Sequence, residues 1–599
     1  MKKISIPVHL AVACAFLYCL VTLYNGSSVQ AVYTSYNIFM LPVLLGLTFV
    51  LHKGFTAFCN LSKRRFIFVI CGVLFAIFFV FGTQVMLNGA VTLQSAFLWI
   101  CILLFSYVLT AFVVLLFTYA LPALQKFFNE HSYPALDKLY SKLNFPLFWL
   151  LIFVCWLPTL LACYPGIFSY DAIYQSSQVT DTLQLNTHHP IIHTLFLGGC
   201  VQLGRSVFGN ANTGMLFYSL IQMLINSAIF AYILTFLKKH AVTVFVQVIC
   251  FAFFAFVPFN SLFAICATKD SIFSTLFVLL FTIVLSLVLD TTKFFTGWKS
   301  PCLFSLTVFL LLIFRNNMLY AFILCIPFLL WIYRKHWKKA VLMLVAPILL
   351  LLLYEGMVYP ALHVTSGNSR EAYSVIMQQY ANVYNNCELE ASDKEQLLAI
   401  MPDESWKKYE PHKSDAIKND FNTEVFEENL VDYMKLWVKL GVQNPSQYVN
   451  AFLNLTYGYW YPNDALPDTT TYRKYIEVYT GGDITFESKL PWLLEKIERF
   501  GMESSYQSIP GLSMLFSPAA YLWLLLFLCA VNFYNKNWKF FIPLLLPATL
   551  FLTLLLGPVA LLRYFYPIML CVPVICALYG KLTEKASAGL NDTHNAEAL

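Results

Sequence analysis

The sequence contains few charged residues. Of its 599 residues only 12% are Asp, Glu, Lys or Arg, whereas a soluble protein usually carries about 25%. Hydrophobic residues make up 59% of the chain, aromatic residues make up 17%, and the mean hydropathy is +0.67. Because so much apolar surface needs lipid to cover it, the composition argues against a soluble protein and predicts an integral membrane protein.

Motifs for disulfides, cofactors and nucleic acids are also missing. The 16 cysteines are scattered through apolar stretches with no CxxC pair, and Cys387 is the only one between 360 and 511. Cysteine therefore behaves here as a small hydrophobic residue. Gly-rich phosphate loops, Walker motifs and nucleic-acid signatures are absent. We expect no nucleic-acid partner and no definite cofactor, and a divalent metal remains an open possibility.

Carboxylates are scarce outside one stretch of the chain. Of the 32 acidic residues 22 lie between 360 and 511, together with 13 of the 38 basic residues. This stretch predicts a water-facing, mostly helical domain. An acidic side chain in the remaining membrane body is costly and marks a candidate functional position.

Apolar runs predict about fourteen transmembrane helices, because each run approaches the length needed to cross roughly 30 Å of hydrocarbon. The runs are 7–24, 38–51, 66–86, 96–118, 146–163, 213–237, 241–257, 271–289, 302–314, 318–333, 340–357, 513–532, 540–556 and 562–579.

The segment 190–208 is ambiguous, since it is apolar but contains His193, Gln202 and Arg205. If it does not cross, the basic loops and both termini all fall on the cytoplasmic side, as the positive-inside rule requires. We therefore predict a re-entrant or interfacial helix on the outer face.

This topology divides an all-α polytopic membrane protein into five parts. They are an N-terminal four-helix membrane segment (1–145), a membrane core (146–358) with an outer loop (164–189) and the re-entrant helix (190–208), an extracytoplasmic domain (359–512), a C-terminal three-helix segment (513–580) and a disordered cytoplasmic tail (581–599). The predicted location is the cell membrane.

Two acidic residues in the outer half of the membrane body are the main candidates for a catalytic role. Asp171 stands alone in an aromatic and apolar loop, where a partly desolvated carboxylate can accept a proton from a hydroxyl; it can equally cap a helix or pair with an arginine. Asp270 follows Lys269 at the start of an apolar run, a pattern also typical of a helix N-cap beside a snorkelling lysine.

Arginines and histidines gather on the same predicted face. Arg315 and Arg563 each border an apolar run, where arginine either anchors a helix at the interface or grips a phosphate with its planar fork. His189 and His193 are four residues apart, which is metal-ligand spacing on a helix, although such pairs are more often structural.

Several of these residues together resemble the GT-C superfamily of membrane glycosyltransferases. They are Asp171 in the first large outer loop, the sequence His188-His189-Pro190 opening an apolar helix, Phe208-Gly209-Asn210 before the next run, and Arg563-Tyr564 with Pro567 near the end of the chain. The resemblance covers most of 146–579. Two further motifs, 374–381 and 315–317, more narrowly resemble an uncharacterised family of bacterial multi-spanning proteins of that layout.

The resemblance implies transfer of a sugar from a polyprenyl-phosphate donor to a glycan, lipid or protein acceptor of the cell envelope, at the outer membrane face. It makes Asp171 the base that deprotonates the acceptor and Asp270 the second acidic residue of the site. Lys269, Arg315 and Arg563 would then bind the lipid phosphate. Further residues are expected to line the substrate cleft, namely Tyr170, Tyr174, His188, His189 and Tyr564.

Two other classes of function remain open from the residues alone. A transporter or a flippase for lipid-linked saccharides would also place charges near the membrane, although it should show broken polar helices in repeated halves. A non-catalytic assembly protein is the third reading, and it offers no reason to collect isolated acids and arginines on one face.

Overall fold

The computed structural model describes residues 5–25, 40–130, 133–168, 171–181, 183–367, 369–462, 482–502, 505–509 and 511–583. Within these ranges the chain is helical, and β-structure is limited to three isolated bridges. Nine of the described helices are long and apolar enough to cross a membrane, and a tenth span results if one bent pair is counted together. Five shorter apolar helices accompany them. The all-α, apolar architecture predicted from composition is confirmed at this level.

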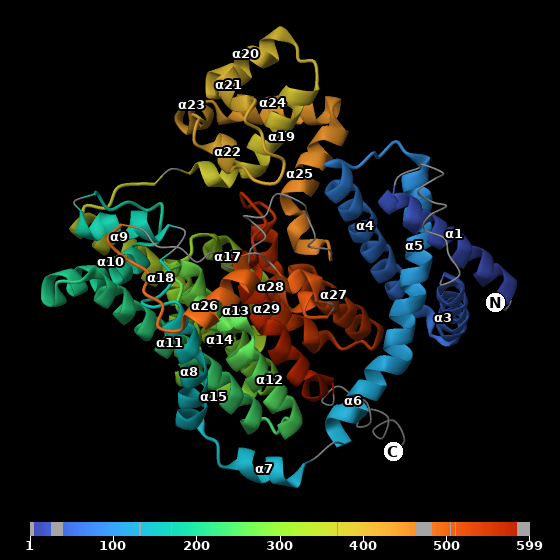
Figure 1. Cartoon of the computed structure of the whole chain (residues 1–599), viewed down its shortest axis with the longest axis horizontal. Helices are drawn as coiled ribbons and strands as arrows, with labels where there is room; N and C mark the ends of the chain where they lie inside the picture. Colours follow the sequence, from blue (N-terminus) through green and yellow to red (C-terminus); the bar gives the residue numbers. More distant parts are fainter. Residues whose placement is uncertain are drawn as a thin grey trace.

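The N-terminal helices form a separate bundle at one side of the molecule (Figure 1). Small residues let its helices approach closely, because a Cβ added to Gly54 would lie 2.8 Å from the Ala111 Cβ. The bundle reaches the rest of the protein chiefly through α4 (Phe66–Asn88), which packs against α25 (Pro445–Trp460) and α27 (Pro518–Tyr534). Its elements are α1 (Ile6–Asn25), α3 (Met40–Asn60), α4 (Phe66–Asn88), α5 (Ala96–Leu115) and α6 (Leu121–Glu130), with α7 (Pro134–Ser141) leading onward.

The membrane core is built around α14 (Lys269–Leu289), which is apolar on all sides and buried along most of its length. It packs against α11 (Ala211–Lys239), α16 (Lys299–Phe314), α28 (Phe541–Leu554) and α29 (Leu562–Ala577). Before it, α12 (Val244–Phe256) and α13 (Pro258–Ala264) meet at a 50° bend. The other core helices are α8 (Phe145–Ala162), α9 (Ala172–Thr180), α10 (Ile191–Phe208), α11 (Ala211–Lys239), α12 (Val244–Phe256), α13 (Pro258–Ala264), α15 (Thr291–Thr296), α16 (Lys299–Phe314), α17 (Asn317–Ile332) and α18 (Trp337–Ala361).

A compact helical body stands above the core and holds its own hydrophobic centre, where Tyr380, Trp406 and Phe426 are fully buried (Figure 1). Its helices are α19 (Ser374–Asn386), α20 (Ala391–Ile400), α21 (Asp403–Trp406), α22 (Asp415–Lys418), α23 (Thr423–Glu428), α24 (Leu430–Gln443) and α25 (Pro445–Trp460). The later part of the predicted 359–512 domain lies elsewhere, since α26 (Pro491–Ile497) packs against α8.

Three apolar helices close the described chain, and they pack beside α14 and α4. They are α27 (Pro518–Tyr534), α28 (Phe541–Leu554) and α29 (Leu562–Ala577). Helical structure continues through 581–583, so the tail predicted for 581–599 starts at least three residues too early, and 584–599 lie outside the described residues.

Candidate functional site

The first turn of α14 carries a buried carboxylate. Thr268 is the N-cap residue, and its Oγ1 accepts a hydrogen bond of 3.3 Å from the Asp270 amide. The cap residue is therefore Thr268 and not Asp270, whose Oδ2 lies 3.3 Å from the Thr268 hydroxyl and can accept a hydrogen bond from it. The Asp270 side chain is only 1% exposed, so its negative charge requires compensation from nearby cations.

Two arginines from distant parts of the chain supply that compensation. Arg315, directly after α16, donates from Nη1 to Asp270 Oδ1 over 2.9 Å. Arg563, in the first turn of α29, places Nε 3.8 Å from Asp270 Oδ2. The arginine side chains are 12% and 13% exposed, respectively. Because Lys269 is adjacent in sequence, three cations gather around one carboxylate, and the cluster has a net positive charge.

Tyr564 orders the two arginines. Its ring centroid lies 4.6 Å from the Arg315 guanidinium carbon and 5.0 Å from that of Arg563. The Tyr564 hydroxyl also accepts a hydrogen bond of 3.3 Å from Arg563 Nη2. The face of an aromatic ring attracts a guanidinium group, so Tyr564 helps to hold both arginines in place. The arrangement suits recognition of an anion with several oxygen atoms, such as a phosphate.

A polar cavity of about 460 Å³ adjoins this cluster. Asp171 opens into it with a side chain that is 47% exposed, whereas His189 is only 4% exposed. The residues that line the cavity are Asp171, Tyr174, Asn186, His188, His189, Thr365, Ser366, Gly367 and Arg370.

His189 joins the cavity to the cationic cluster. Its Nδ1 lies 3.2 Å from Lys269 Nζ and 3.9 Å from Asp171 Oδ2. Burial, reinforced by the positive charge of Lys269, lowers the pKa of His189 to about 2. The imidazole is therefore neutral near pH 7 and accepts a hydrogen bond from Lys269. Since a neutral ring cannot form an ion pair and 3.9 Å exceeds hydrogen-bonding distance, the Asp171 carboxylate remains available to a molecule in the cavity.

The segment leading into the upper body forms the opposite wall of the cavity. Thr187 donates its amide to the Thr365 carbonyl over 3.0 Å, and the Gly367 amide donates to Thr187 Oγ1 over 2.7 Å. A Cβ at Gly367 would lie 2.5 Å from the His188 amide nitrogen, so only glycine permits this approach. The upper body is thus fastened directly to the loop that carries both histidines.

His193 does not share the position of His189. It is fully buried in α10, where Nδ1 lies 2.7 Å from Gln175 Oε1 and Nε2 lies 2.8 Å from the Tyr218 hydroxyl. Among the described residues no group of three or more His, Cys, Asp or Glu side chains is placed to hold a metal.

Most of the residues selected from the sequence come together. Asp171, His189 and Lys269 are linked by the contacts above, and Asp270 binds Arg315 and approaches Arg563. A further set lies beside these residues, namely Tyr174, His188 and Tyr564. Tyr170 lies outside the described residues.

Sequence reasoning missed Asn186, the 365–367 segment and Arg370. These residues stand out in the sequence only because they are polar. Polar residues occur throughout a water-facing domain, so this property does not distinguish the ones that line a cavity.

Comparison with known proteins places the chain in a family. Residues 179–592 match the "Family of unknown function (DUF6020)". The chain belongs to this family. The matched region contains His189, Lys269, Asp270, Arg315 and Arg563, whereas Asp171 lies just before it. No curated protein and no solved structure matches the chain.

Proposed function

We propose that this DUF6020 protein is a membrane glycosyltransferase that uses a polyprenyl-phosphate-linked sugar as donor. In this proposal the chain crosses the membrane fourteen times with both termini in the cytoplasm. Helix α10 lies at the outer face, where transfer to a cell-envelope glycan, lipid or protein takes place. The layout rests on the distribution of basic loops and on the gathering of Asp171, Lys269, Arg315 and Arg563 in one region.

The convergence of Arg315 and Arg563 on one buried carboxylate is the observation that carries the proposal. When the bond between sugar and phosphate breaks, the leaving phosphate gains negative charge. Preorganised cations stabilise that charge most effectively in a site from which water is largely excluded. Lys269 lies between the arginine cluster and the cavity, so it is suited to contact the same phosphate.

Asp171 is the proposed general base for the acceptor. It is the carboxylate that lines the cavity, and its charge is not consumed by an ion pair with the neutral His189. A hydroxyl bound in the cavity can transfer its proton to Asp171 as it attacks the sugar carbon. Tyr174, His188 and Asn186 would hold the acceptor through ring contacts and hydrogen bonds.

Asp270 takes a different part in this proposal from the one suggested by the resemblance. Its 1% exposure and its 2.9 Å contact with Arg315 leave it little access to a substrate proton. It acts as a positioning residue, because its carboxylate attracts both guanidinium groups and keeps them close together. Its removal would leave three cations repelling one another in a buried cluster.

A photoreactive polyprenyl phosphate, applied to the full-length protein in membranes, tests the proposal. We expect labelling that excess polyprenyl phosphate suppresses and polyprenol does not. Arg563→Gln should reduce labelling at least tenfold. Arg205→Gln is the matched control, since Arg205 binds Asp483 away from this cluster. Equal competition by polyprenol, or full labelling of Arg563→Gln, would contradict a phosphate site at these arginines.

A further inference from the structure

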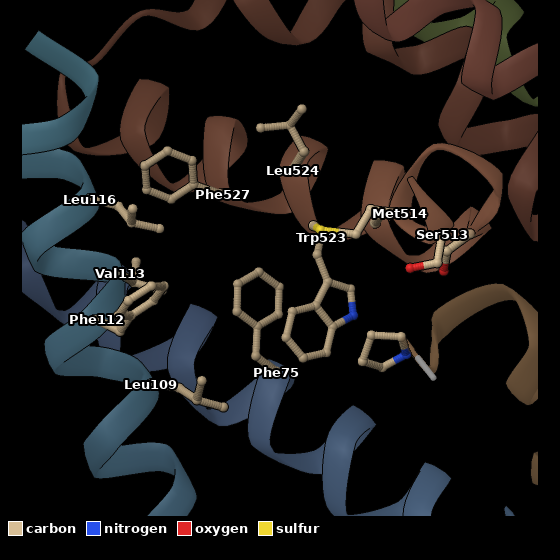
Figure 2. Close-up of a pocket in the computed structure, with 13 residues that line it drawn as sticks. Phe75, Leu109, Phe112, Val113, Leu116, Ser513, Met514, Trp523, Leu524 and Phe527 are labelled. Atoms are coloured by element: carbon tan, nitrogen blue, oxygen red, sulfur yellow. The ribbon is translucent and has the colours of Figure 1, made fainter. Parts of the chain in front are cut away.

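A second cavity, of about 380 Å³, lies between the N-terminal bundle and α27 (Figure 2). Leu109, Phe112, Val113 and Leu116 form one wall from α5 and its continuation. Other apolar side chains form the facing walls, namely Phe75 of α4 and Ala520, Trp523, Leu524 and Phe527 of α27. Apolar walls of this kind do not retain water, so a hydrocarbon is the natural occupant in a membrane.

The cavity has one polar end. Ser513 and Ser517 line it there, beside Met514 and Pro462. Ser517 is only 3% exposed, and its hydroxyl has no hydrogen-bond partner among the described residues. Although Ser517 is the N-cap residue of α27, its side chain does not cap the helix. A buried hydroxyl without a partner costs free energy, which a ligand with an oxygen acceptor would recover.

The indole N–H of Trp523 already has a hydrogen-bond acceptor in the protein, so it is not available to donate to a ligand in the cavity. Its Nε1 donates to the Trp460 carbonyl over 2.9 Å, and its ring stacks on Phe75 with centroids 4.2 Å apart. These contacts fix the middle of the cavity wall, and Figure 2 shows the two rings side by side. The hydroxyl of Ser517 therefore remains as the buried donor at the polar end.

The dimensions fit one lipid chain within a single leaflet. Helix α27 has 17 residues, or roughly 25 Å at 1.5 Å per residue, so its N-cap lies close to the edge of the hydrocarbon layer. From Ser517 to Phe527 the cavity follows α27 for roughly 15 Å, which is half of the hydrocarbon thickness of about 30 Å. It thus extends from the interface to about the bilayer centre.

The chemistry of the polar end favours an ester over a phosphate. None of the described residues that line this cavity is charged. A phosphate held there would lack the arginine or lysine that such groups require. An ester carbonyl, which lies at the edge of the hydrocarbon layer, is a neutral acceptor and matches a neutral hydroxyl.

We propose that this cavity binds one acyl chain of a glycerophospholipid, whose ester carbonyl accepts a hydrogen bond from Ser517. The lipid fills the seam between the N-terminal bundle and the rest of the protein. The inference does not depend on the glycosyltransferase proposal, because the residues that form this site are separate from the arginine cluster and from the polar cavity.

Lipid retention tests the site. The full-length protein, purified from a phospholipid membrane and washed by repeated detergent exchange, should keep one phospholipid by native mass spectrometry. Ala520→Phe fills the cavity and should reduce retention at least fivefold, and Leu524→Trp provides a second filling variant if the first does not fold. Leu552→Phe, on an exposed lipid-facing position of α28, is the matched control. Unchanged retention in both folded filling variants, or retention of a polyprenyl phosphate instead, overturns the proposal.

Ester recognition is tested by comparing diester and diether phospholipids of equal chain length. The parental protein should prefer the diester about fivefold, the effect of one neutral hydrogen bond. Ser517→Ala should remove this preference. Ser106→Ala should keep it, because the Ser106 hydroxyl already bonds to the Ile102 carbonyl within its own helix. Equal binding of both lipids by the parental protein contradicts the proposed hydrogen bond.

Discussion

Replacing Asp171 with Asn should remove most sugar transfer while leaving the protein folded. The side chain is 47% exposed and makes no capping hydrogen bond, although Asp171 precedes the first turn of α9. An amide at this position should therefore cost little stability. Losing a general base lowers the rate about 10²-fold or more, which is about 2.7 kcal/mol in activation free energy.

The assay is transfer of labelled sugar from a polyprenyl-phosphate donor in membranes, with donor binding measured separately. Binding should change little, because Lys269, Arg315 and Arg563 are untouched. Asp181→Asn provides the matched control, since Asp181 lies in the same outer loop but pairs with Arg205 at 3.3 Å. If Asp171→Asn folds, binds donor and transfers sugar at the parental rate, Asp171 is not the base.

Three further outcomes follow. Arg563→Lys keeps the charge but loses the planar fork, so donor binding should fall, and full binding by both Arg563→Lys and Arg563→Gln would indicate a simple membrane anchor. Because the pKa of His189 is about 2 in the folded protein and about 6.5 in the unfolded chain, only the unfolded chain binds this proton between these two pH values. Stability from this group is thus complete above about pH 6.5 and declines below it, and thermal unfolding of His189→Asn should show a smaller loss on acidification. Single cysteines near Lys239 and Lys338 should resist an impermeant thiol reagent, whereas one near Asp415 should react; labelling near Lys239 from outside would reverse the topology.

The helices of the membrane body could be predicted from the sequence because lipid imposes a simple rule on composition. Each of the fourteen apolar runs overlaps a helix of the described residues, and 190–208 overlaps α10 (Ile191–Phe208). The boundaries were harder to predict. The run 38–51 stops at His52 and Lys53, but α3 continues to Asn60, and Lys53 extends over the rings of Phe49 and Tyr119.

The individual charged residues of the candidate site could also be predicted from the sequence, because charged residues are rare in an apolar chain. The contacts that these residues make with one another could not be predicted in this way. Nothing in the sequence indicates that Arg315 and Arg563 meet at one carboxylate, since this depends on how α16 and α29 pack around α14. The cavity wall from 365 to 367 is likewise a product of tertiary structure.

Helix α25 connects the three parts of the molecule on which these proposals depend. In the N-terminal bundle, the Val91 amide donates to Asn450 Oδ1 over 2.7 Å, and Asn454 Nδ2 donates to the Gly89 carbonyl over 2.7 Å. At its other end Tyr459 stacks on Phe565, two residues after Arg563, with centroids 5.9 Å apart. Both asparagines are buried, so these hydrogen bonds hold α25 firmly. The same chain continues from the wall of the polar cavity through the upper body into α25, which contacts both the N-terminal bundle and α29. The N-terminal bundle, which lies outside the family match, therefore contacts the helix that leads out of the upper body.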